Sequence, residues 1–256
     1  MEINKIYNEN CLETMLRMPD CFIDLTVTSP PYDNLREYKG YSFPFEDIAK
    51  ELYRVTKIGG VVVWVVGDAT NQFNETLTSF NQAIYFQRLG FLIETMIYEK
   101  ESITWNENSG RYKQNFEYMF IISKGKPKTF NPIKDVKVTN MNPRKAKSNR
   151  TGKVRYDLVI PNEITTRGNI WYYPSGSSTN ECTEHPAVFP EKLAADHIHS
   201  WSNEGDLVYD CFAGSGTTLK MAHLQKRNWI GSEISKEYCE IAEKRIAPYL
   251  AQTFLF

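Results

Sequence analysis

The sequence predicts an α/β fold built on a parallel sheet, and three observations support that prediction. Short β-branched or apolar runs of strand length alternate with segments of helical spacing. The 256 residues are 41% hydrophobic and 24% charged, which is enough to bury one large core. A tight glycine turn at 212–218 joins a predicted strand to a predicted helix, as in ligand-binding α/β units.

The first block of the chain, residues 1–123, supplies most of the alternation. Residues 24–28 predict a buried strand that stops at two prolines, and 45–57 predict a helix with Ile48, Leu52 and Val55 on one face. Residues 58–60, with two glycines, are expected to end that helix. The remaining predicted elements are a strand covered on both faces at 61–66, a helix at 79–89 closed by Gly90, and strands at 91–98 and 118–122.

The last block, residues 181–256, repeats the pattern. A helix is predicted at 191–200 after Pro190 and a short strand at 206–210. The glycine turn follows, and we expect its helix at 219–225. A strand at 229–233 that ends in Glu233 and a helix at 237–250 close the chain.

The segment between these blocks, residues 124–180, is basic and has no clear period. Residues 124–167 carry 12 Lys and Arg against 3 Asp and Glu, although the whole chain has a net charge of -1. A charge run is usually a solvated loop. The alternative is an insert that binds a polyanion, because Lys and Arg neutralise phosphates. Trp171, Tyr172 and Tyr173 lie late in this segment and could contact a base or pack beneath it.

Several classes of protein are disfavoured. The sequence has neither an apolar run of membrane-spanning length nor an apolar signal segment, so we expect a cytoplasmic protein. Its 5 cysteines are scattered without a CxxC pair, which argues against a disulfide framework and a zinc knuckle. His197 and His199 form an HxH pair without a third ligand at metal spacing, so we predict no metal site.

Two motifs carry the chemistry. In the first, Gly214 and Gly216 let the backbone turn sharply and approach a ligand, with Asp210 before them. Glu233 follows at the end of the next strand, where α/β units place a carboxylate on ribose hydroxyls. The full GxGxxG pattern and the P-loop lysine are absent, which favours a nucleoside without a pyrophosphate, such as S-adenosylmethionine.

The second motif is Thr28-Ser-Pro-Pro-Tyr32 at the end of a predicted strand. The carboxyl ends of parallel strands form the ligand-binding edge of such sheets. Two prolines fix the backbone there, so that the Ser29 Oγ and the Pro30 carbonyl can accept hydrogen bonds from one amino group. Tyr32 offers an aromatic face for stacking a planar base.

Together, Ser29-Pro-Pro-Tyr32 and Phe212-Ala-Gly-Ser-Gly216 resemble the amino-directed DNA methyltransferases, which modify N4 of cytosine or N6 of adenine. The order, proline motif first and glycine motif last, resembles the circularly permuted β group of that family. Residues 45–68, 111–125 and 185–197 resemble further family segments, the last through its HPxxxP pattern. The family usually has an acidic residue where Asn10 stands.

The resemblance implies a Rossmann-like S-adenosylmethionine-dependent methyltransferase fold, circularly permuted. Residues 1–123 would be its catalytic half, 124–180 a basic target-recognition insert and 181–256 its cofactor-binding half. Double-stranded DNA would be the substrate. The implied site residues are Ser29, Pro30, Pro31 and Tyr32 for catalysis, Asp210, Phe212, Ala213, Gly214, Ser215, Gly216, Thr217, Thr218, Glu233 and His185 for the cofactor, and Arg144, Lys145, Lys147, Arg150, Lys153 and Arg155 for DNA.

The implied reaction moves a methyl group to the amino nitrogen of a flipped base, which costs a few kcal/mol to extrude. In the family, serine at the position of Ser29 favours cytosine, whereas adenine enzymes more often carry Asp or Asn there. Methylation of cytosine C5 is rejected because no Pro-Cys pair occurs. Adenine N6, an RNA or protein acceptor, and a non-catalytic DNA-binding module remain as alternatives. The resemblance adds a second copy of the chain and a separate restriction enzyme as candidate partners, without an independent signal in the residues.

Overall fold

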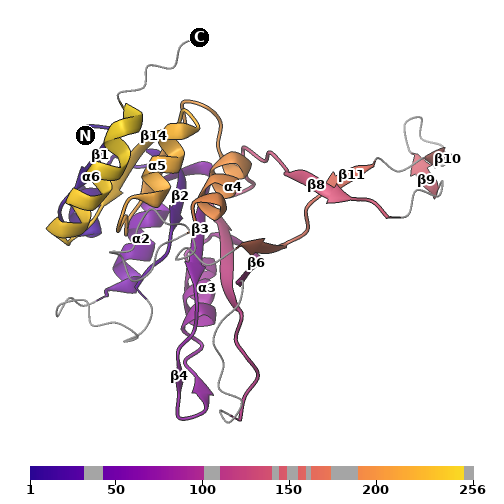
Figure 1. The fold of residues 1–256 in the computed structure, drawn as a ribbon, viewed down its shortest axis with the longest axis horizontal. Helices are drawn as coiled ribbons and strands as arrows, with labels where there is room; N and C mark the ends of the chain where they lie inside the picture. The colour runs from indigo at the N-terminus through magenta and orange to yellow at the C-terminus, as the bar shows by residue number, and fades with distance from the viewer. Residues whose placement is uncertain are drawn as a thin grey trace. The chain divides into compact units, whose positions relative to one another are not determined.

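The computed structural model describes residues 1–31, 43–100, 110–139, 163–173 and 190–250, and the backbone of 144–148 and 155–159. The chain divides into a main unit, Met1–Asn131 with Asn169–Phe256, and a small unit, Pro132–Gly168. The main unit contains the predicted α/β fold (Figure 1).

An eight-stranded sheet forms the centre of the main unit, in the order β1-β14-β13-β2-β3-β7-β6-β12. The first five strands in this order, β1, β14, β13, β2 and β3, are parallel to their neighbours, in line with the predicted parallel sheet. Strand β12 is parallel to β6. The strands span Lys5–Tyr7 (β1), Ile23–Thr28 (β2), Thr56–Val66 (β3), Leu92–Lys100 (β6), Phe116–Ser123 (β7), Ile170–Tyr173 (β12), Leu207–Asp210 (β13) and Asn228–Ser232 (β14).

The expectation of a wholly parallel sheet is wrong at β7. This strand runs antiparallel to both of its neighbours, β3 and β6. An antiparallel neighbour needs no crossover helix, whereas a parallel one does. The chain between β6 and β7 contains no helix in its described part, 110–115.

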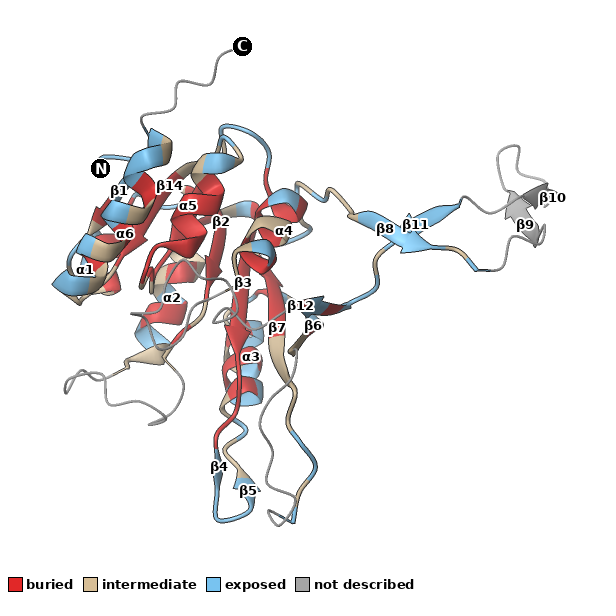
Figure 2. Cartoon of the chain, in the orientation of Figure 1, coloured by how far each residue is buried: buried red, intermediate tan, exposed pale blue. Residues whose placement is uncertain are grey.

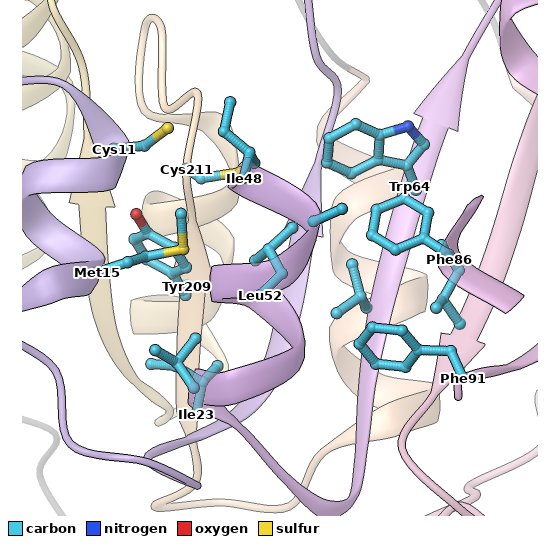
Figure 3. Packing of buried hydrophobic residues seen from close by; sticks show 14 of the residues in the cluster. Cys11, Met15, Ile23, Ile48, Leu52, Trp64, Phe86, Phe91, Tyr209 and Cys211 are labelled. Atoms are coloured by element: carbon cyan, nitrogen blue, oxygen red, sulfur yellow. The ribbon is translucent and has the colours of Figure 1, made fainter. Parts of the chain in front are cut away.

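In the described ranges, six helices flank the sheet in two groups. Helices α1, α2 and α3 pack one against the next, as do α4, α5 and α6. Figure 3 shows α2 in front of the strands, with helices of the second group behind them. No helix in the described ranges has the length and apolarity to cross a membrane. The helices span Cys11–Leu16 (α1), Phe45–Val55 (α2), Thr78–Arg88 (α3), Glu191–Trp201 (α4), Thr217–Leu224 (α5) and Lys236–Leu250 (α6).

The glycine pair expected to end the second helix has another role. Helix α2 already ends at Val55, and Gly59 and Gly60 lie inside β3. A Cβ at Gly59 would lie 2.9 Å from the Cβ of Lys128, and one at Gly60 would lie 2.9 Å from the Lys57 carbonyl oxygen. The glycines therefore allow a close approach of backbone and side chain rather than a helix end.

Trp64 of β3 is a fully buried member of the hydrophobic core. Its ring lies 5.3 Å from that of Phe86 in α3 and 6.2 Å from that of Phe212, centroid to centroid. Its indole Nε1 donates to Gln82 Oε1 at 2.8 Å, so the buried N–H has a partner. Figure 3 shows Trp64 beside Phe86 and Phe91, with Ile48 and Leu52 of α2 nearby. Phe212 thus connects this core to the glycine turn.

The small unit contains strands that the sequence did not reveal. Strand β8 (Lys134–Lys137) pairs antiparallel with β11 (Ile164–Thr166), and β9 (Arg144–Ser148) with β10 (Arg155–Val159). Every residue of β8 and β11 is exposed, so this ribbon does not need the alternating apolar pattern by which strands are recognised (Figure 2). The range 124–180 includes this unit and also β12, which belongs to the main sheet.

Helix α5 begins two residues earlier than predicted, because Gly216 at φ +78° forms its N-cap. Helix α6 packs directly against that glycine. A Cβ at Gly216 would lie 2.7 Å from the Cβ of Ala242. The turn therefore needs glycine both for its left-handed backbone and for the space next to α6.

We predict that Gly216→Ala destabilises the fold by about 2–5 kcal/mol, from the left-handed backbone and the collision with Ala242. Gly125→Ala is the matched control, because Gly125 has the same φ of +78° and nothing within 4 Å of its ideal Cβ. The control should lose only the backbone part, about 1–2 kcal/mol. Urea unfolding of both variants measures the difference, and equal losses would contradict the packing argument.

Candidate functional site

The two motifs meet at the carboxyl edge of the sheet. Strand β13 lies between β14 and β2, and all three are parallel. Ser29 and Pro30 follow β2, the glycine turn follows β13, and Glu233 follows β14. Strand ends of neighbouring parallel strands lie side by side, so these residues face one edge.

A buried hydrogen bond joins the two motifs. Thr28 Oγ1, one residue before Ser29, donates to Asp210 Oδ1 at 2.7 Å. The same carboxylate oxygen accepts the Phe212 backbone N–H at 3.1 Å, which starts the turn. Thr218 Oγ1 donates to the Val27 carbonyl at 3.3 Å and ties the first turn of α5 to β2. The proline motif and the glycine turn therefore hold each other in place.

Glu233 is bonded to the glycine turn itself. Its Oε2 accepts the Gly214 N–H at 2.9 Å and its Oε1 accepts the Ser235 N–H at 2.8 Å. The Ile234 backbone also contributes a hydrogen bond to this carboxylate. A carboxylate has about four acceptor positions, so acceptor capacity remains for a ligand. The structure thus brings Gly214 and Glu233 together, as the motif predicted.

Burial dominates the electrostatics of both carboxyl groups. Desolvation raises the pKa of Asp210 to about 6, against the opposing effect of its hydrogen bonds from Thr28, Phe212 and Thr218. Desolvation also raises the pKa of Glu233, although its backbone hydrogen bonds lower it in part. Two carboxyl groups with raised pKa values at one edge are typical of a ligand site.

A second layer of charged residues supports the turn from behind, and sequence reasoning missed it. Arg245 Nη1 donates to the Ser215 carbonyl at 2.7 Å and to Thr217 Oγ1 at 3.2 Å. Glu191 Oε1 accepts from Arg245 Nη2 at 2.8 Å and from Lys220 Nζ at 2.9 Å. These residues come from α4, α5 and α6, too far apart in the chain for any local pattern to relate them.

The remaining predicted site residues differ in whether the structure describes their positions. Phe212 packs edge-on against Phe43, with ring centroids 5.7 Å apart, and Ala213 is buried. Tyr32, His185, Arg150 and Lys153 lie outside the described residues. Pro31 is half-buried after Pro30. The other predicted DNA contacts lie in the β9–β10 pair, where only the backbone is described: Arg144, Lys145, Lys147 and Arg155.

Asn10 and His197, both singled out in the sequence, make contacts within the fold. Asn10 forms the N-cap of α1, where its side chain accepts the Leu12 N–H at 2.9 Å. His197 is buried, stacks on Trp171 at 4.7 Å between centroids, and lies 3.2 Å from Met119 Sδ through its Nε2. Among the residues with described positions, no group of three His, Cys, Asp or Glu side chains could hold a metal ion.

Comparison with known proteins gives consistent results. The family model described as DNA methylase, covering N6 and N4 enzymes, matches residues 23–244. The orphan methyltransferase M.BamHII of Bacillus amyloliquefaciens is 56% identical over 242 residues, covering 90% of this chain and 91% of that protein. The Type II methyltransferase M.BglII of Bacillus subtilis is 28% identical, covering 94% and 68%.

Solved structures share the fold. The PvuII DNA methyltransferase, titled cytosine-N4-specific, superposes with a TM-score of 0.72 at 21% identity, covering 98% of this chain and 88% of that one. An M1.HpyAVI–SAM complex superposes with a TM-score of 0.65 at 23% identity, covering 94% and 98%. The Rossmann-like methyltransferase fold expected from the sequence is confirmed.

We predict that Asp210→Asn flattens the pH dependence of stability between pH 4 and 7. The pKa of Asp210 is higher in the folded state, about 6, than in an unfolded chain, so its contribution is full at low pH and is lost as pH rises through about 6. The wild type should lose about 2–3 kcal/mol more than the variant across that window. Urea unfolding at several pH values measures this.

Glu94→Gln, which removes a carboxyl group from an exposed position, is the control and should follow the wild-type curve. A variant Asp210→Asn that also follows the wild-type curve would show that Asp210 is not the source of the pH dependence.

Proposed function

Because the chain belongs to the DNA methylase family of N6 and N4 enzymes, we propose that it transfers a methyl group from S-adenosylmethionine to N4 of a cytosine in DNA. The observation that carries this proposal is the 2.7 Å hydrogen bond between Thr28 and Asp210. It ties the residue before Ser29 to the start of a glycine turn that is itself bonded to Glu233, which supports Ser29 and Pro30 as acceptors for the amino group. The amino group that accepts the methyl and the cofactor that donates it would therefore meet at one edge of the sheet.

The glycine turn fits S-adenosylmethionine. The acceptor capacity of the Glu233 carboxylate beyond its backbone hydrogen bonds would serve ribose hydroxyls, and Gly214 presents no side chain to a ligand. Phe212, two residues after Asp210, adds an aromatic ring that packs against Phe43. When bound, S-adenosylmethionine supplies an electrophilic methyl group on its sulfonium.

Residues 29–32 would bind the base whose amino group accepts the methyl group. An exocyclic amino nitrogen is a poor nucleophile because its lone pair is delocalised into the ring. Hydrogen bonds from the amino group to the Ser29 Oγ and the Pro30 carbonyl favour a tetrahedral nitrogen with a localised lone pair. Stacking of the flipped base on Tyr32 offsets about 1–3 kcal/mol of the cost of flipping. No covalent enzyme intermediate is needed.

Ser29 favours cytosine as the acceptor. Adenine enzymes of the family more often carry Asp or Asn at this position, whereas serine is more frequent in cytosine enzymes. The same two acceptor atoms also suit the amino group of adenine, so adenine N6 is the alternative that the first experiment separates.

We predict that DNA incubated with the protein and isotopically labelled S-adenosylmethionine acquires labelled N4-methylcytosine, detected by mass spectrometry of its nucleosides. Labelled N6-methyladenine would overturn the assignment of cytosine as the target base, but it would leave the proposed roles of Ser29 and Pro30 unchanged. Absence of label in DNA, with cofactor binding intact, would redirect the search to RNA or protein acceptors.

We predict that Ser29→Ala lowers kcat at least about 100-fold while DNA and cofactor binding remain. The reason is that the variant loses the side-chain acceptor for the amino group. Tyr32→Ala should also abolish transfer. Ser29→Asn keeps an acceptor oxygen and should retain more activity than Ser29→Ala. Transfer at the wild-type rate in both alanine variants would refute the site assignment.

We predict that the basic insert contacts the DNA backbone. Reversing the charge at Arg144, Lys145 and Lys147 should weaken DNA binding and reduce its salt dependence, by about 0.9 in the log–log slope for each lost phosphate contact. Reversal of three exposed lysines in the main unit, Lys5, Lys50 and Lys236, is the matched control. Equal affinity and salt slope in the two triple variants would exclude the insert as the DNA contact.

A further inference from the structure

A strained hairpin follows β3 directly. Strands β4 (Thr70–Asn71) and β5 (Asn74–Glu75) pair antiparallel across a two-residue turn, Gln72–Phe73. Gln72 has φ +48° and Phe73 has φ +66°, so both are left-handed. Such turns favour Asn-Gly, and a bulky residue in this conformation is an outlier. Backbone strain of this kind is concentrated at functional sites.

No folding advantage explains the phenylalanine at the tip. The Phe73 side chain is 78% exposed, so it buries little apolar surface. A glycine would relieve the backbone strain at this position without loss of core packing. The residue is therefore better explained by a ligand than by the fold.

The hairpin is braced so that its tip is held in place. Arg111 donates to Thr70 Oγ1 at 2.9 Å and to Glu75 Oε1 at 2.5 Å, so it bridges both strands. At the base, the Thr76 N–H donates to the Ala69 carbonyl at 3.0 Å. The buried carboxylate of Asp68 accepts from the N–H of Ser79 at 2.8 Å, which fixes the hairpin to the start of α3.

The hairpin extends from the same sheet edge as the candidate site. Thr28 of β2 is in register with Trp64 of β3, and the chain continues past that level to Thr70 (Figure 1). Six residues of extended chain reach up to about 20 Å. The amino end of the antiparallel β7 lies at this edge too, and Tyr112, just before it, is 100% exposed. A Cβ at Gly110 would lie 3.7 Å from the Phe73 ring.

We propose that the β4–β5 hairpin is a second DNA-contacting element, whose tip enters the major groove near the target base. The proposal rests on the proposed function, which puts duplex DNA at this edge. The major groove admits a two-stranded ribbon. The amide side chains exposed there, Asn71, Gln72 and Asn74, suit the N6 and N7 edge of adenine, and the Phe73 ring suits the methyl group of thymine. The hairpin would thus contribute specificity in addition to the basic insert.

The test uses Phe73→Gly in the full-length chain. Replacing a strained left-handed residue by glycine should raise the melting temperature, so a loss of DNA recognition could not be attributed to unfolding. Ile58→Ala is the matched control, because Ile58 is also 78% exposed and lies at the opposite end of β3. Gln72→Ala tests the amide contact separately.

Two measurements are made on each protein. Gel retardation with a fragment pool of long unmethylated viral DNA gives binding, and incorporation of labelled methyl groups into the same DNA, followed by sequencing of modified sites, gives kcat/KM and sequence preference. We expect Phe73→Gly to lower DNA affinity and kcat/KM about tenfold or more and to relax the preference at one position of the site. The salt dependence should stay unchanged, because no phosphate contact is lost.

The outcomes separate the two proposals. Wild-type affinity, kcat/KM and sequence preference in Phe73→Gly would overturn the hairpin proposal. Altered sedimentation of Phe73→Gly with unaltered DNA binding would also overturn it, and would assign the tip to contact with a second copy of the chain. Absence of methyl transfer by the wild type, with DNA binding that still depends on Phe73, would overturn the proposed function and leave the hairpin proposal standing.

Discussion

The hydrogen bond between Thr28 and Asp210 connects the two halves of the candidate site. Both residues are buried, and in such surroundings a hydrogen bond is stronger than in water, while an unpaired partner is costly. The bond spans 182 residues of sequence and crosses from β2 to the neighbouring β13. Because Ser29 follows Thr28 and the glycine turn follows Asp210, the proposed binding sites for the methyl acceptor and the methyl donor are joined by this one contact.

The charged layer behind the turn has a related role. Glu191, Lys220 and Arg245 join three helices, and Arg245 also holds the Ser215 carbonyl. Lys220 is buried, whereas Glu191 and Arg245 are partly exposed. Ion pairs with a buried member add little net stability, because desolvation offsets much of their attraction. Their contribution here is positional: they give the turn one arrangement, which a ligand site requires and a hydrophobic contact would specify less sharply.

Two left-handed backbone positions illustrate how the same conformation serves different purposes. At Gly216 the position is crowded by Ala242 of α6, so a residue without a side chain is needed for packing. At Phe73 the position is exposed, and the side chain is presented outward at an energetic disadvantage to the fold. Gly216 is therefore explained by packing within the fold, whereas Phe73 is explained by the ligand contact proposed above.

The sequence by itself determined most elements of the main unit and the family resemblance. Strand and helix periodicity, the glycine turn and the paired prolines act over a few residues, so the runs at 24–28 and 61–66 and the turn at 212–218 could be recognised directly. The reversed direction of β7, the addition of β12 to the sheet and the partners of Asp210 depended on the tertiary structure. So did the bracing of the turn by Arg245 and of the hairpin by Arg111. These contacts join residues distant in the chain, and which distant groups meet is decided by strand pairing and burial rather than by any local pattern.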